Sequence, residues 1–172
     1  MRWALIFLMP IKAKFGTLQR KSNSWISKTR CKAQMLGKIS SEGATSLHIY
    51  KGTLDTDTYC DILEEHKLEM DQIFPRGYEF QHENLPTHLA AEDWMTRQHF
   101  KIVNFPTYSW DLSPIENVWS TLKGAVAVDN PKTEAQLRKS FLWNWETLLI
   151  IFNLTLKIYI VVMMNVLKKM VI

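Results

Sequence analysis

The chain has 172 residues, 47% of them hydrophobic and 12% aromatic, which suits one folded domain with a proper core and argues against disorder. Its net charge of +4 permits contact with a phosphate backbone without requiring it. The two cysteines, Cys31 and Cys60, form neither a disulfide framework nor a zinc-ligand pattern, so we expect a reducing, intracellular setting.

Two apolar segments imitate targeting signals. The run over residues 3–9 is short, ends at Pro10 and lacks a small-residue cleavage site, so secretion is not expected. Residues 148–162 are interrupted by Asn153 and Lys157 before they reach the roughly 20 apolar residues that a membrane span needs. We expect a buried terminal helix there, with a membrane-associated apolar tail as the alternative.

The first third of the chain predicts strands. Residues 3–9 are rich in strand formers and predict a buried strand, which Pro10 should keep from continuing as a central strand. Residues 12–32 are basic and polar and predict an exposed loop or a weak hairpin. Residues 34–40 and 46–50 predict a hairpin of two strands.

Helices and strands then alternate. Residues 55–57 should cap a helix with Tyr59, Ile62, Leu63 and His66 on its buried face, and residues 78–82 predict a short strand. The next helix is expected to turn Leu89, Ala90, Trp94 and Met95 inward, before a strand over residues 101–105. This order predicts an α/β domain with a mixed sheet flanked by helices, whose binding edge lies where strands end.

Two helix starts follow. Ser113 can cap a helix in which Pro114 takes the first position, and Ile115, Val118 and Trp119 recur at helical spacing. Thr133 and Gln136 form a capping-box pattern for another helix. Its expected apolar face contains Leu137, Phe141, Leu142 and Trp145.

Glu83 and Glu116 are the candidate chemical groups, because each follows a strand-like segment and a turn. At one sheet edge, such carboxylates would suit Mg²⁺ or Mn²⁺, which in pairs stabilise the attacking and leaving oxygens of phosphoryl transfer. A plainer interpretation stays open for each residue. Glu116 could complete a capping box with Ser113, and Glu83 could be a solvated charge.

Two further polar residues lie near these carboxylates in the sequence. His88 could contact a phosphate or a carboxylate, or serve a structural role at a helix start. Asp111 could support the site or stabilise its turn.

Two motifs carry a family resemblance. Residues 109–119 read SWDLSPIENVW, which resembles the Ser-Pro-Asp-Leu-Asn-Pro-Ile-Glu-Asn-x-Trp signature of Tc/mariner-type transposases. Residues 80–88, FQHENLPTH, resemble the family's Gln-Gln-Asp-Asn-x-Pro-x-His segment. A third resemblance covers residues 52–63, and the motifs occur in the family order.

The resemblance implies an RNase H-like fold and a DDE/D triad that binds Mg²⁺ or Mn²⁺. It places Glu83 and Glu116 at the second and third acids, with Asn84, His88 and Asp111 as neighbours that would support them. Residues 1–172 would form one catalytic domain, and residues 148–172 would be a drifted helical tail.

The departures from the family pattern bear on activity. The first catalytic aspartate falls on Met9, whose thioether is a poor ligand for magnesium. Glu83 replaces an aspartate and moves its carboxylate by roughly an ångström, a displacement that can cost on the order of 100-fold in rate. We therefore expect a transposase-derived domain with impaired catalysis.

The expected partner is DNA, bound weakly and without sequence preference, since no counterpart of the family's helix-turn-helix region precedes Trp3. The resemblance implies a nuclear location and is compatible with a homo-oligomer. The alternative function is a non-catalytic module that binds DNA or protein.

Overall fold

The computed structural model describes residues 4–21, 24–82, 85–103 and 113–150. Within these ranges, five strands form one mixed sheet in the order β3-β2-β1-β4-β5. The strands are β1 (Ala4–Lys21), β2 (Ser24–Ile39), β3 (His48–Tyr50), β4 (Tyr78–His82) and β5 (Lys101–Ile102). The strands β1, β4 and β5 are parallel, whereas β2 is antiparallel to both β1 and β3. The predicted mixed α/β architecture is confirmed.

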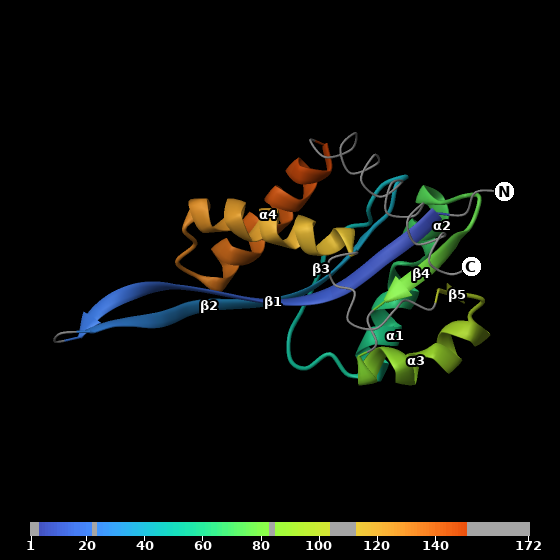
Figure 1. Cartoon of the computed structure of the whole chain (residues 1–172), viewed down its shortest axis with the longest axis horizontal. Helices are drawn as coiled ribbons and strands as arrows, with labels where there is room; N and C mark the ends of the chain where they lie inside the picture. Colours follow the sequence, from blue (N-terminus) through green and yellow to red (C-terminus); the bar gives the residue numbers. More distant parts are fainter. Residues whose placement is uncertain (1–3, 22–23, 83–84, 104–112, 151–172) are drawn as a thin grey trace.

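Helices cover both faces of this sheet (Figure 1). The helices α1 (Thr56–Glu65), α2 (Lys67–Ile73) and α3 (Pro86–Arg97) lie on one face, and α4 (Pro114–Asp129) lies on the other with a helix over residues 134–150. The α1–α3 core includes Leu36, Tyr59, Met70, Phe80 and Met95. The α4 core includes Met35, Trp119, Leu122, Phe141 and Trp145. The sheet therefore separates two apolar layers.

The strands β1 and β2 form a long hairpin that extends away from the rest of the molecule (Figure 1). The structure thus decides between the two predictions for residues 12–32 in favour of the hairpin. The first strand continues past Pro10 to Lys21, but only as one arm of the hairpin, which agrees with the prediction that it does not continue as a central strand. Among the described residues, β4 pairs with β1 only as far as Leu8, so Pro10 has a strand partner on one side alone and its missing N–H can be tolerated there.

The helix caps agree with the sequence at two starts. The Asp55 carboxylate accepts a hydrogen bond from the Thr58 amide at 2.9 Å. The Thr133 hydroxyl accepts one from the Gln136 amide at 3.2 Å, and the Gln136 side chain accepts one from the amide of Lys132 at 2.8 Å. The pattern at residues 133–136 is therefore a real helix start, with its return bond displaced by one residue.

The predicted buried face of α3 is partly wrong. Leu89 is 49% exposed and Ala90 is also exposed, whereas His88, Ala91 and Met95 are fully buried. The rotation of the helix is set by its first turn, because the His88 ring stacks on Tyr59 of α1 with ring centres 4.5 Å apart. The following strand is shorter than predicted, and residues 104–105 lie outside the described residues.

The last described helix has the predicted apolar face. Leu137, Phe141 and Trp145 are at most 1% exposed, and Leu142 is half-buried. Most of the predicted terminal helix falls in residues 151–172, outside the described part of the chain. Across the residues that are described, no helix combines the length and the apolar character needed to cross a membrane.

Gly37 permits the close approach of α4 to the sheet. The rings of Trp119 and Trp145 stack with centres 5.4 Å apart and lie against this glycine. A Cβ at residue 37 would be 2.6 Å from Trp119 Cη2 and 2.9 Å from Trp145 Cη2. Both indoles are about 1% exposed, so neither has room to move aside.

We predict that Gly37→Ala lowers the free energy of unfolding by about 1–3 kcal/mol, because the added methyl overpacks a rigid core. Gly124→Ala in α4 is the matched control, since a Cβ there meets nothing within 4 Å. The control should instead stabilise the protein by about 0.5–1 kcal/mol. Urea unfolding of both variants checks this, and equal effects would contradict it.

Candidate functional site

The parallel pair β1–β4 leads towards two of the expected metal-ligand positions. Its register ends with Leu8 opposite His82. Met9 and Glu83 are the next residues along the two chain segments. Glu83 and Asn84 lie outside the described residues, as does Asp111. The described backbone therefore ends one residue short of the second acid.

The helix α4 crosses the sheet close to residue 9. Met9 pairs with Gly37 of β2, and Trp119 packs directly on that glycine. Glu116 lies about one helical turn before Trp119. The third expected ligand is thus carried by the helix that packs on the strand pair containing Met9.

Glu116 lies in the first turn of α4 and is half-buried. Its amide donates to the Ser113 carbonyl oxygen at 3.2 Å. The Ser113 side chain makes no capping hydrogen bond, so the predicted side-chain cap at Ser113 is wrong. The backbone carbonyl has replaced the hydroxyl as acceptor, and the serine side chain is buried. Glu116 therefore lacks one of the two bonds of a capping box, while the helix N-terminus still favours its carboxylate.

The donor set at these positions fits a hard cation poorly. Glu116 offers carboxylate oxygens, which suit Mg²⁺ and Mn²⁺. Met9 stands where the family resemblance places the first carboxylate, and a thioether is a soft donor that does not select these cations. The first position therefore does not match the oxygen ligands that Mg²⁺ and Mn²⁺ prefer.

His88 lies in the core and not at the surface. It is fully buried, and its ring stacks on both Tyr59 and His82, with centres 4.5 and 5.2 Å away. The structure thus places His88 behind the end of β4, where it packs against the residue that precedes Glu83.

His82 belongs to a buried polar stack that the sequence reasoning missed. Its Nδ1 lies 3.4 Å from the Tyr59 hydroxyl, and its Nε2 lies 3.6 Å from the Glu92 carboxylate. Burial lowers the pKa of His82 to about 4, so the ring is neutral at pH 7. The only sequence signal was the run of polar residues at the end of a predicted strand. The stack therefore holds the last residue of β4 in place.

His82 should make the protein sensitive to acid. In the unfolded chain the pKa of His82 is near 6.5. Between pH 6.5 and about 4, His82 is therefore protonated in the unfolded state and neutral in the folded state. The free energy of unfolding should fall as pH drops from 6.5 towards 4, by about 2 kcal/mol at pH 5. In His82→Gln this part of the loss should disappear, which chemical unfolding at pH 7 and pH 5 measures. Equal pH slopes in both proteins would contradict the assignment, since His48 and His66 are present in both.

The comparisons with known proteins agree with the sequence resemblance. A family model described as DDE superfamily endonuclease matches residues 14–138. The Tc1 transposase of Caenorhabditis elegans is 40% identical over 50 residues, covering 28% of this chain and 18% of that protein. The Tcb1 transposase of Caenorhabditis briggsae is 32% identical over 97 residues, covering 52% of this chain and 36% of that protein. The matches therefore span well under half of the length of these relatives.

Solved structures share the fold. The crystal structure of the catalytic domain of Mos1 mariner transposase matches with a TM-score of 0.63 at 14% identity, covering 92% of this chain and 81% of that one. The same catalytic domain with Raltegravir and Mn gives a TM-score of 0.63 at 14% identity, over 92% and 82% of the two chains. With Raltegravir and Mg the TM-score is 0.62 at 14% identity, over 92% and 83%. The predicted RNase H-like fold is confirmed.

Proposed function

Because the chain belongs to the DDE superfamily endonuclease family, we propose that it is the catalytic domain of a Tc/mariner-type transposase. Its ancestral reaction is then metal-dependent DNA cleavage and strand transfer. In this proposal, residues 1–172 form one such domain, and the catalytic activity of this chain is impaired. The observation that carries the proposal is the position of Glu116 on α4. It lies one turn before Trp119, which packs on Gly37, the strand partner of Met9.

The ancestral chemistry assigns each position a role. In this reaction class, carboxylates hold divalent cations that stabilise the attacking and leaving oxygens. Glu116 retains a carboxylate at the third position, and Glu83 supplies one at the second. The related catalytic domain has been solved with Mn and with Mg, which supports a divalent cation as the ancestral cofactor.

Impairment follows from the first position. At Met9 the chain offers neither a negative charge nor an oxygen ligand, and the longer Glu83 side chain changes the reach of the second carboxylate. Misplacement of about 1 Å can cost on the order of 100-fold in rate. We propose that this chain keeps the fold but has little DNA cleavage or strand-transfer activity.

A strand-cleavage assay with Mg²⁺ or Mn²⁺ should give no metal-dependent turnover for the natural sequence. The double variant Met9→Asp with Glu83→Asp should bind Mn²⁺ more tightly, because it restores oxygen ligands at the first two positions. The variant Met9→Leu with Glu83→Asp is the matched control, and its affinity for Mn²⁺ should rise less. Robust turnover by the natural sequence that is lost in Glu116→Ala would overturn the proposed impairment, and no gain in the double variant would overturn the assignment of Met9.

A second candidate function is a DNA-binding module that acts without catalysis, and the β1–β2 hairpin favours it. Lys14 and Lys32 are exposed and lie directly opposite one another on the two strands, and Lys12 is exposed nearby. Like charges in opposite positions destabilise a strand pair. A polyanion such as DNA would relieve this repulsion.

Binding of duplex DNA at several salt concentrations tests this candidate. If both lysines contact phosphates, Lys14→Gln with Lys32→Gln should reduce the slope of log K against log salt by about 2. Lys123→Gln with Lys139→Gln changes the net charge equally, at exposed sites on α4 and on the helix over residues 134–150, and should leave the slope nearly unchanged. Equal effects of the two pairs, or no binding at low salt, would remove the candidate.

A further inference from the structure

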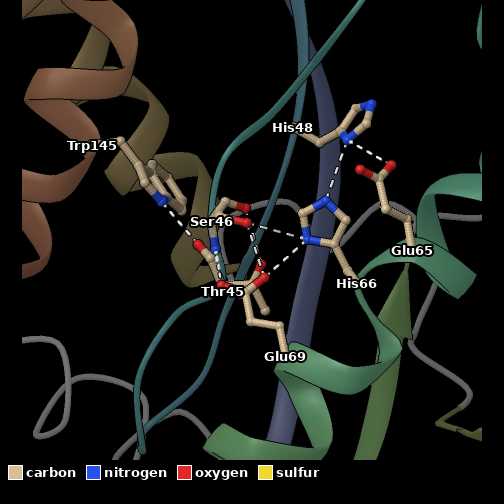
Figure 2. A network of polar contacts seen from close by, with 7 residues as sticks. All are labelled: Thr45, Ser46, His48, Glu65, His66, Glu69 and Trp145. Atoms are coloured by element: carbon tan, nitrogen blue, oxygen red, sulfur yellow. Dashed lines mark hydrogen bonds and ion pairs between the residues drawn. The ribbon is translucent and has the colours of Figure 1, made fainter.

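Two histidines and a glutamate from separate elements converge beside the edge strand β3. His48 belongs to β3, Glu65 ends α1, and His66 is the single residue between α1 and α2 (Figure 2). His48 Nδ1 lies 3.2 Å from His66 Nε2 and 3.6 Å from Glu65 Oε2. Among the described residues, one ligand atom of each lies within 4.8 Å of the other two. The three side chains therefore present their donor atoms to one small volume.

We propose that His48, Glu65 and His66 form a binding site for a transition-metal ion, Zn²⁺ in the first instance, separate from the acidic site of the family. Tetrahedral zinc has bonds of about 2.0–2.2 Å to nitrogen and oxygen, which places neighbouring ligand atoms roughly 3.3 Å apart. The two measured separations bracket this value. Two imidazoles with one carboxylate suit zinc better than the hard cations Mg²⁺ and Mn²⁺.

Glu69 orients one of the two imidazoles. Its Oε2 lies 3.0 Å from His66 Nδ1, so that nitrogen carries the proton and donates it to the carboxylate. His66 Nε2 is then left with a lone pair towards His48. A carboxylate on the far nitrogen of a histidine is the usual support of a metal-binding imidazole.

Ser46 fixes Glu69 in turn. Its amide donates to Glu69 Oε1 at 2.7 Å, and its hydroxyl donates to Glu69 Oε2 at 2.9 Å (Figure 2). The neighbouring Thr45 carbonyl accepts from the Trp145 indole at 3.0 Å. The support for His66 is therefore anchored in the opposite core and is in place before any ion binds.

Lys38 is a buried side chain on the same face of the sheet as the cluster. It lies two residues after Leu36 on β2, and Leu36 pairs with His48, so strand alternation puts Lys38 on the face of the cluster. Its side chain is fully buried near Glu65 and Glu69, yet its Nζ has no hydrogen-bond partner among the described residues. A water or an anion on the open position of a three-ligand zinc ion would supply an acceptor there.

The physical role of the ion would be to join the edge strand to the helices. His48 is on β3, whereas Glu65 and His66 are at the junction of α1 and α2. Binding to the folded chain alone stabilises it by mass action, so Zn²⁺ should raise the melting temperature. Without an ion, the same residues form a hydrogen-bonded network, which is the competing explanation of their convergence.

The test is a titration of the chelator-treated full chain with Zn²⁺ alone, read by calorimetry. We expect one ion per chain, a higher Tm, and tetrahedral absorption bands when Co²⁺ replaces Zn²⁺. His48→Ala should remove most of the affinity. Glu65→Gln should weaken zinc binding and leave the free energy of unfolding of the metal-free protein nearly unchanged, because that side chain is 68% exposed. Glu69→Gln, which replaces the carboxylate that positions His66, should weaken zinc binding about 10–100-fold.

Two controls separate this site from others. His99→Asn removes an exposed histidine elsewhere and keeps the positive φ of 65° accessible, so zinc binding should not change. Glu116→Ala removes the family acid and should also leave zinc binding unchanged. Absence of saturable one-to-one binding, equal binding in Glu65→Gln and the natural sequence, or loss of binding in Glu116→Ala would overturn the proposal. Each result is independent of the cleavage assay.

Discussion

The contact of two stacked tryptophans with Gly37 decides where α4 lies on the sheet. A side chain at residue 37 would occupy the space of both indoles, so the helix approaches this strand closely only because the residue is glycine. Gly37 is also the partner of Met9 in the adjacent strand. The apolar packing of α4 thereby fixes the position of its first turn, which carries Glu116, relative to the sheet.

The two apolar layers account for the stability of the fold. The two layers are held by buried apolar side chains on either face of the sheet, and Glu116 is not among them. Burying apolar surface supplies most of the stability of such a domain, whereas clustered carboxylates repel one another when no cation is bound.

The two faces of the sheet are linked through a short loop. Trp145 of the α4 core donates to the Thr45 carbonyl, and the next residue, Ser46, holds Glu69 beside His66. The histidine cluster at β3 is thus rigidly connected to the opposite core. An ion bound there would act on the position of the edge strand relative to both layers.

Local pattern was enough for the strand at residues 78–82, the start of α4 at Pro114 and the burial of Trp119 and Trp145. In each case the signal is a period of two or 3.6 residues, or a residue that suits a helix end. Tertiary structure alone decided that β1 passes Pro10, that α3 turns Leu89 outward, and that His48 meets His66 across 18 positions of sequence. These outcomes depend on which strand borders another and on how a ring in one helix stacks on a neighbour, and such long-range pairings leave no trace in local periodicity.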